Sequence, residues 1–399
     1  MNTPIRQYMV VTASYWVFTL TDGALRMLVI LYFHQLGYSP FEVASLFLLY
    51  EFCGVITNLI GGWLAAHIGL NTSLHFGLAL QIVALCMLLV EPSLLSVVYV
   101  MVAQAISGIA KDLNKMSAKS SIKLLAPNNA QGKLYQWVAL LTGSKNTLKG
   151  IGFFLGATLL TLLGFRAAIA ILAFCLIIAL MVSFLLLQKD LGKTKYKPKF
   201  TDIFSKSSAV NQLSAARFFL FGARDIWFVI ALPVYLQEHL YWDYTEVGTL
   251  LAAWVIGYGF VQSASPLITG IRRGKIPDGR TAMLWATLLA IMPLAIAGFL
   301  QQGWQADSVL IIGLLAFGAI FAVNSAVHSY LIIAYAKEDG VSLDVGFYYM
   351  ANALGRLVGT LLSGWVYQSY GLISCLIVSA IFIMITSLLS IALPRHHAI

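Results

Sequence analysis

The chain has 399 residues, a mean hydropathy of +0.84 and a formal net charge of +9 at pH 7. Hydrophobic residues make up 60% of it and charged residues only 10%, so lipid must be the solvent for most of its surface. This composition excludes a soluble enzyme or a soluble binding domain of the same length. The four cysteines lie far apart in separate apolar runs, so we expect no metal site, no disulfide frame and no cofactor.

Twelve apolar segments along the chain are long enough to cross a bilayer. We expect helices, because backbone in lipid must satisfy its own hydrogen bonds and no segment alternates with the period of a barrel strand. The first segment is too long for a signal peptide and lacks a small-residue cleavage site, so we expect it to be retained. The predicted spans cover approximately residues 8–34, 40–66, 72–90, 94–118, 132–163, 165–188, 209–237, 244–270, 281–300, 307–336, 341–369 and 371–393.

One lysine-rich polar segment divides these spans six and six. We predict an N-terminal six-helix bundle over residues 1–188, a cytoplasmic linker over 189–208 and a C-terminal six-helix bundle over 209–399. Loops on the opposite side carry only Arg166, so the positive-inside rule places the N and C termini in the cytoplasm. The basic residues of the predicted cytoplasmic segments are Arg6, Lys119, Lys123, Lys133, Arg272, Arg273, Lys275, Arg280, Lys337 and Arg395.

The two halves resemble each other in sequence. "LGYSPFEVASL" matches "LYWDYTEVGTL", "SGIAKDLN" matches "FGAIFAVN", and "LKGIG" matches "GRLVG" at an offset of 207 residues. Two six-helix repeats are typical of transporters, and this pattern resembles the major facilitator superfamily. That family's loop signature is present only in part, in "GGWLAAHIGLN". The predicted fold is thus an all-α membrane protein with two pseudo-repeats. The offset aligns Lys149 with Arg356, Gly152 with Gly359 and Gly164 with Gly371.

Several basic residues lie deep within predicted spans, where an ionisable group is costly unless it faces protein or water. Lys149 is sixteen residues from both Lys133 and Phe165, or roughly 24 Å from either end of its helix, farther than a lysine side chain reaches. These residues fall on spans 1, 4, 5, 7 and 11, which line the central cavity in the superfamily. The candidate substrate-binding residues are Arg26, Lys111, Lys115, Lys145, Lys149, Arg224 and Arg356.

The interior holds fewer acids than bases. Asp22 is either the partner of Arg26 in its own helix or a proton-coupling group, and Glu51 is either a cross-helix partner or a proton carrier. We interpret Lys119 and Lys123 as cytoplasmic edge charges. Arginine clamps phosphate or carboxylate groups and lysine supplies mobile charge, so the excess predicts an anionic substrate with more than one negative group.

Five long motifs in the sequence resemble those of one particular transporter family. "TDGALRMLVILYFHQLGYSP", "SGIAKDLNKMSAKSSIKLL", "GSKNTLKGIGFFLG", "FLFGARDIWFVIALPVYL" and "SLDVGFYYMANALGRLVGTLLSGWVYQ" resemble the ArsJ family of organoarsenical exporters, from about Arg6 to Pro394. The resemblance implies export of 1-arseno-3-phosphoglycerate, which glyceraldehyde-3-phosphate dehydrogenase forms when it uses arsenate in place of phosphate. It also implies a functional partnership with that dehydrogenase and arsenate resistance.

The sequence therefore predicts a monomeric, multi-pass exporter of the bacterial inner membrane that works by alternating access, with proton antiport expected by superfamily analogy. We expect no enzymatic activity and no nucleic-acid partner. Two alternatives stay open. One is an organophosphate or phosphate exchanger of the same fold, and the other is a membrane sensor that binds its ligand without transporting it.

Overall fold

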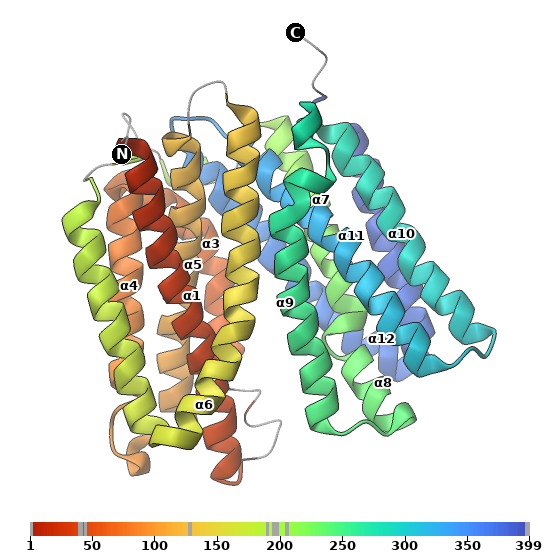
Figure 1. Ribbon diagram of the computed structural model, residues 1–399, viewed down its shortest axis with the longest axis horizontal. Coiled ribbons are helices and arrows are strands. Elements are labelled where there is room, and N and C mark those ends of the chain that lie inside the picture. Colours follow the sequence, from red (N-terminus) through yellow and green to blue (C-terminus); the bar gives the residue numbers. More distant parts are fainter. Residues whose placement is uncertain are drawn as a thin grey trace. The chain divides into compact units, whose positions relative to one another are not determined.

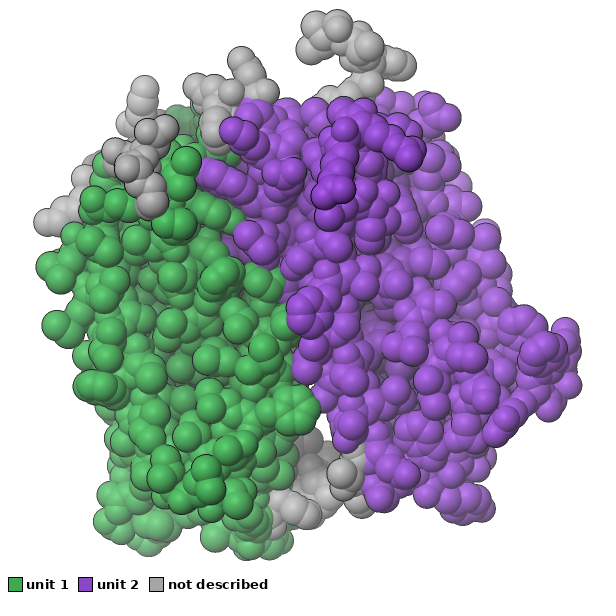
Figure 2. Space-filling view, in the orientation of Figure 1, with its two compact units in different colours: residues 1–129, 144–204, 336–350 green, residues 130–143, 205–335, 351–399 purple. Residues whose placement is uncertain are grey.

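The computed structural model describes residues 3–38, 43, 46–126, 130–188, 191–193, 199–203 and 207–395. Throughout these residues the secondary structure is helical and no strand occurs. The chain packs as two compact units. Unit 1 contains residues 1–129, 144–204 and 336–350, and unit 2 contains residues 130–143, 205–335 and 351–399 (Figure 2).

Unit 1 is a bundle of long helices that run side by side (Figure 1). Its members are α1 (Thr3–Gln35), α3 (Leu48–Ile68), α4 (Leu70–Met87), α5 (Val97–Leu125), most of α6 (Gln131–Leu186) and the first turns of α12 (Val341–Ile391), with the short helices η1 (Pro92–Leu94) and η2 (Phe200–Ile203).

Unit 2 is a second helical bundle, built around a core of buried aromatic and aliphatic side chains. It contains α7 (Ser208–Phe228), α8 (Ala231–Leu240), α9 (Tyr244–Ile268), α10 (Gly279–Gln301), α11 (Ala306–Tyr335) and the rest of α12, together with the start of α6 and the short helix η3 (Ile271–Arg273).

The twelve predicted spans map onto these helices. Spans 5 and 6 form the two arms of α6, spans 11 and 12 form the two arms of α12, and span 7 is divided between α7 and α8. Nine of the described helical segments are long and apolar enough to cross a membrane. The helix α5 falls short of that hydropathy because its second half carries Lys111, Asp112, Lys115, Lys119 and Lys123. The predicted all-α fold is confirmed.

Two glycines turn the chain inside the longest helices. Gly164 has φ 77° and ψ 172°, and Gly371 has φ 76° and ψ −178°. This backbone region is open essentially to glycine alone. The two positions are the ones that the sequence repeat aligns at an offset of 207, so the repeat extends to backbone geometry.

The helices that meet at the repeated glycines approach each other closely. A Cβ atom on Gly152 would lie 2.5 Å from the Leu20 carbonyl oxygen of α1, and a Cβ atom on Gly359 would lie 2.5 Å from the Gly222 carbonyl oxygen of α7. Only a glycine permits backbones to pack at this distance. Close helix approach at this pair of aligned glycines therefore occurs in both units.

Each unit also contains the first turns of a helix whose remaining residues belong to the other unit. In unit 1, the Ser342 hydroxyl of α12 donates a hydrogen bond of 2.8 Å to the Gly62 carbonyl of α3. In unit 2, the Tyr330 hydroxyl of α11 donates one of 3.0 Å to the side-chain oxygen of Gln131 of α6. These first turns lie in segment 336–350 of unit 1 and segment 130–143 of unit 2, which the repeat aligns at its offset of 207 residues. Half of the predicted linker over 189–208 lies outside the described residues, and the linker stays a prediction.

Gly164→Ala and Gly371→Ala should each lower the free energy of unfolding by about 1–3 kcal/mol, because alanine must adopt a glycine-only backbone conformation. Gly298→Ala is the matched control, since a Cβ atom there meets open space within a regular helix. Thermal unfolding of the detergent-purified variants measures the effect. Equal unfolding temperatures for all three variants would contradict the strain argument.

Candidate functional site

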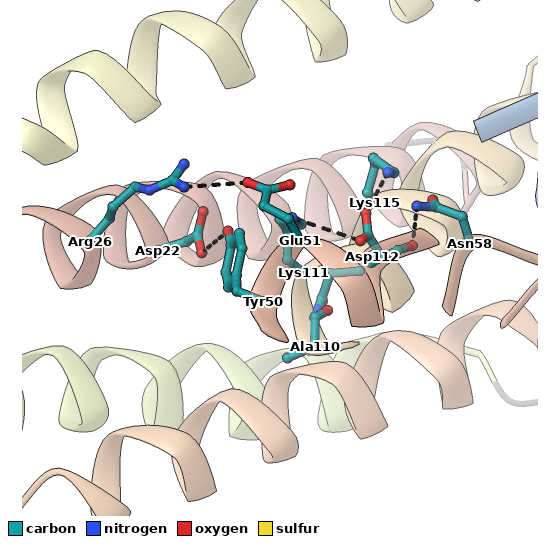
Figure 3. Close-up of polar contacts among 11 residues, drawn as sticks. Asp22, Arg26, Tyr50, Glu51, Asn58, Ala110, Lys111, Asp112 and Lys115 are labelled. Atoms are coloured by element: carbon teal, nitrogen blue, oxygen red, sulfur yellow. Dashed lines mark hydrogen bonds and ion pairs between the residues drawn. The ribbon is translucent and has the colours of Figure 1, made fainter. Parts of the chain in front are cut away.

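Charged side chains gather inside unit 1 from four of its helices. Arg26 and Asp22 come from α1, Glu51 comes from α3, and Lys145 and Lys149 come from α6. The remainder, Lys111, Asp112, Lys115 and Lys119, comes from α5 (Figure 3 shows several of them). We call these nine residues the unit 1 cluster. It holds six basic and three acidic side chains, so its formal charge is positive.

Arg26 bridges two helices of the cluster. Its guanidinium lies 3.3 Å from the Glu51 carboxylate (Figure 3). It also lies 4.9 Å from the centre of the Phe47 ring. The Tyr50 hydroxyl donates a hydrogen bond of 2.8 Å to the carboxylate of Asp22. Of the two roles left open for Glu51, the structure contains the cross-helix ion pair. Sequence could not identify Arg26 as the partner because the pair joins residues 25 positions apart.

Asp112 is the most enclosed acid of the cluster, with 2% of its side chain exposed. Its carboxylate accepts a hydrogen bond from Lys115 and lies 3.8 Å from the Lys111 ammonium (Figure 3). The Lys111 ammonium also sits 3.8 Å from the centre of the Tyr50 ring. Gly54 leaves room for this carboxylate, since a Cβ atom there would lie 2.6 Å from it. One buried carboxylate therefore holds two of the predicted substrate-binding lysines.

The interpretation of Lys119 as an edge charge is wrong. Only 4% of Lys119 is exposed, and its ammonium donates a hydrogen bond to the hydroxyl of Tyr349. Tyr349 belongs to the first turns of α12, which are part of unit 1. This contact joins residues 230 positions apart, so the spacing of lysines along α5 could not reveal it.

The charges around Lys145 and Lys149 are mostly positive. The charges that act most strongly on Lys145 are all ammonium groups, those of Lys119, Lys149, Lys115 and Lys111. The charges that act on Lys149 are those of Arg26 and Lys111 and of the Asp22 and Glu51 carboxylates. Both lysines are half-buried, and neither makes a hydrogen bond or ion pair with any residue that the structure describes. They are therefore the two cations of the cluster that no described carboxylate pairs with.

Unit 2 holds the remaining predicted residues. Asp225 is fully buried, and one of its carboxylate oxygens lies 2.5 Å from the Arg224 guanidinium. The other carboxylate oxygen accepts a hydrogen bond of 3.0 Å from Arg356. Arg224 is 14% exposed and Arg356 is 41% exposed, so both guanidinium groups retain some access to solvent. Again one buried carboxylate holds two predicted ligands of the substrate.

Arg217 of α7 is a buried cation that is not among the candidate residues predicted from sequence. It is 3% exposed and donates hydrogen bonds to the Asn352 side chain at 2.9 Å and to Ser325 at 3.3 Å. Its guanidinium stacks 3.8 Å from the centre of the Phe221 ring. Polar residues on α11 and α12 were the only sequence signal for this environment.

The arrangement suits binding rather than bond chemistry. The described residues contain no group of three or more His, Cys, Asp or Glu side chains placed to hold a metal ion. All four cysteines are free thiols at separate positions. Ammonium and guanidinium groups in partly water-excluded surroundings bind oxyanions through charge-assisted hydrogen bonds.

Comparison with known proteins places this geometry in context. The family model of the Major Facilitator Superfamily matches residues 11–230 and 213–398. No curated protein sequence matches the chain significantly.

Solved structures of several transporters superpose over nearly the whole chain. The human organic anion transporter MFSD10 has a TM-score of 0.77 at 15% identity, covering 98% of this chain and 100% of its own. FucP, captured in the outward conformation, has a TM-score of 0.76 at 11% identity, covering 98% and 99%. A bacterial homologue of the iron transporter ferroportin, in an outward-facing state, has a TM-score of 0.74 at 15% identity, covering 98% and 99%.

Tyr50→Phe should lower the free energy of unfolding by about 1–3 kcal/mol, because it removes the hydrogen bond to the buried Asp22 carboxylate. Tyr50→Leu should lower the free energy of unfolding further, since it also removes the ring that faces Lys111 and Arg26. Thermal unfolding of the purified variants measures both losses. The exposed Tyr370→Phe is the control and should be neutral. Equal losses for the two Tyr50 variants would mean that the ring faces contribute nothing.

Proposed function

The chain belongs to the Major Facilitator Superfamily and is a multi-pass membrane transporter, and we propose that its cargo is an organic anion with more than one negative group, which it exports from the cytoplasm. The expectation that the protein is not an enzyme is confirmed, because the family and its structural relatives are transporters. The expectation of a small-molecule substrate and a lipid environment agrees with that membership.

One observation carries this proposal, the positive excess of the unit 1 cluster. Charges inside a membrane protein are costly and are retained where they bind or move a charged substrate. Six basic side chains share three carboxylates there, and Lys145 and Lys149 have no ion-pair partner among the described residues. An incoming dianion would supply the missing negative charge.

The sequence motifs that resemble the ArsJ family support a specific cargo, 1-arseno-3-phosphoglycerate. This ester carries a phosphate at one end and an arsenate at the other, so it offers two oxyanions to the basic side chains. The separate free cysteines also fit, because pentavalent arsenic in an ester needs oxygen-binding cations rather than thiolates. Glyceraldehyde-3-phosphate dehydrogenase would supply the ester, and its export would confer arsenate resistance.

The energetics favour export from the bacterial inner membrane by alternating access. A membrane potential that is negative inside favours the outward movement of each uncompensated negative charge by about 2.3 kcal/mol per 100 mV. Proton antiport would add to this, with Asp22 or Glu51 as the titrating carboxyl. We expect the transporter to act as a monomer.

Uptake into everted membrane vesicles tests the function directly. Purified dehydrogenase, glyceraldehyde-3-phosphate, NAD and arsenate outside the vesicles make the labile ester in place, and arsenic accumulated inside is measured. We expect accumulation only when all components and the transporter are present. Vesicles that bind the ester without accumulating it would favour a membrane sensor.

An organophosphate exchanger is the second candidate, because lysine and arginine bind phosphate as well as arsenate. Unlabelled 3-phosphoglycerate separates the two. It should compete weakly if the arseno-ester is the cargo, since one of the two oxyanions is replaced by a carboxylate. Competition at equal affinity, with export of 3-phosphoglycerate itself, would establish the exchanger.

Lys149→Ala and Arg356→Ala should each abolish arsenate resistance while membrane levels stay normal, because each removes a cation proposed to bind the substrate. Arg166→Ala is the control, since Arg166 forms an exposed pair with Glu91. Growth on arsenate and quantitative blotting of membranes measure the outcome. Normal resistance in both single variants would remove these two residues from the site.

Glu51→Gln should slow gradient-driven efflux and leave efflux without a proton gradient unchanged if Glu51 carries the coupled proton. The glutamine keeps the size of the side chain and a hydrogen-bond acceptor for Arg26. Efflux is measured from vesicles with and without an imposed pH gradient. Unchanged stimulation by the gradient would assign Glu51 to the ion pair alone.

A further inference from the structure

Two buried aspartates show the same arrangement in the two units. Asp112 is 2% exposed and holds Lys111 and Lys115, while Asp225 is 0% exposed and holds Arg224. Asp225 also holds Arg356 through its second oxygen. All four of these basic residues are proposed ligands of the substrate, yet neither aspartate was a candidate site residue. In both units a carboxylate of the protein occupies the donors that an anionic substrate would use.

The competition between these carboxylates and a substrate follows from hydrogen-bond chemistry. A carboxylate and a phosphate or arsenate group accept hydrogen bonds from the same ammonium and guanidinium donors. A lysine has three donors and an arginine five, but the donors that point at the aspartate cannot point at an incoming oxyanion. Asp112 makes no other hydrogen bond or ion pair with the described residues, so it depends on these two lysines.

Lys145 and Lys149 provide the contrast within the same cluster. Neither forms an ion pair with a carboxylate of the described residues, so they can receive an anion without displacing one. The cluster therefore contains two kinds of cation. Lys145 and Lys149 can bind an anion without breaking an ion pair. Lys111 and Lys115 can bind one only when their contacts with Asp112 break.

We propose that Asp112 and Asp225 are resident counter-anions that neutralise the substrate-binding cations of the empty transporter and exchange places with the oxyanions of the substrate. This inference rests on the proposed function and deepens it. It assigns to the two aspartates the task of neutralising Lys111, Lys115, Arg224 and Arg356 in the empty transporter. A buried cation that loses its partner is strongly destabilising.

This role predicts which step of transport depends on the aspartates. With substrate bound, the oxyanions neutralise the cations, so reorientation of the loaded transporter does not need the aspartates. After release, the empty transporter must reorient with its cations neutralised from within. Net transport requires the empty return step, whereas exchange of one substrate molecule for another does not.

The first test measures binding. Purified wild type, Asp112→Asn and Asp225→Asn are titrated with inorganic phosphate, and thermal unfolding is followed. We expect the phosphate concentration for half-maximal stabilisation to fall by about tenfold in each variant, because the internal competitor is gone. An unchanged or higher concentration in both variants would overturn the inference. Asp307→Asn is the control, since Asp307 accepts a hydrogen bond from Trp242 and contacts none of the proposed ligands.

The second test separates the two modes of transport in proteoliposomes. Enclosed dehydrogenase makes the labile arseno-ester from radiolabelled arsenate, and labelled arsenic is followed as net efflux and as exchange with unlabelled ester made outside. We expect the ratio of net efflux to exchange to fall by about tenfold or more in Asp112→Asn and Asp225→Asn. A ratio equal to that of the wild type would contradict the role in the empty return step.

Charge-balanced double variants test whether a lower ratio in the single variants comes from misfolding. Asp112→Asn with Lys115→Gln, and Asp225→Asn with Arg224→Gln, each remove one negative and one positive charge together. We expect the ratio of net efflux to exchange to recover towards that of the wild type, even where affinity is weaker. A ratio that stays low would show that the carboxylates act in another way, such as carrying a proton.

The outcomes distinguish this inference from the proposed function. If wild-type vesicles fail to accumulate the arseno-ester, the proposed export fails. The phosphate titration still decides whether the aspartates compete with oxyanions. If export holds and the titration shows no competition, the counter-anion role alone is removed.

Discussion

The structure depends on the neutralisation of charge in surroundings that exclude water. A charged side chain in lipid has a high free energy unless it has a partner, yet the described spans hold both lysines and arginines. The protein meets this constraint with a few carboxylates placed between them. Asp225 holds two arginines of unit 2, and Asp112 holds two lysines of unit 1. Lys145 and Lys149 form no ion pair with the described residues, and the proposed function assigns to them the first contact with an anionic cargo.

The pseudo-repeat extends from sequence to backbone but only in part to the charged sites. Gly164 and Gly371 adopt the same conformation, and Gly152 and Gly359 pack in the same way against the first helix of each half. The charges differ, because Lys149 has no ion pair among the described residues whereas its counterpart Arg356 contacts Asp225. Helix packing is thus shared by the repeats, while the charged sites have diverged.

Most of the fold and part of the site could be predicted from sequence. Hydropathy gave the spans, and the repeat identified the glycines at which α6 and α12 turn. Depth along a helix identified Lys149 as an interior cation. Sequence could not find the Arg26–Glu51 pair or the burial of Lys119, because each depends on contacts between helices distant in the chain. Hydropathy shows which residues enter the membrane, whereas pairing depends on how the helices are rotated against one another.

The difference between lysine and arginine bears on what the two units can recognise. The lysines of unit 1 are compact, mobile charges that adjust to oxyanions of different size, whereas the guanidinium groups of unit 2 present fixed planes of donors. Phosphate and arsenate are both tetrahedral oxyanions, so neither kind of cation separates them by charge. If the cargo is the proposed arseno-ester, its discrimination from an ordinary phosphate ester must then come from the number of oxyanions offered. Under the proposed exchange with Asp112 and Asp225, a cargo with two such groups can displace more contacts of the internal carboxylates than a cargo with one.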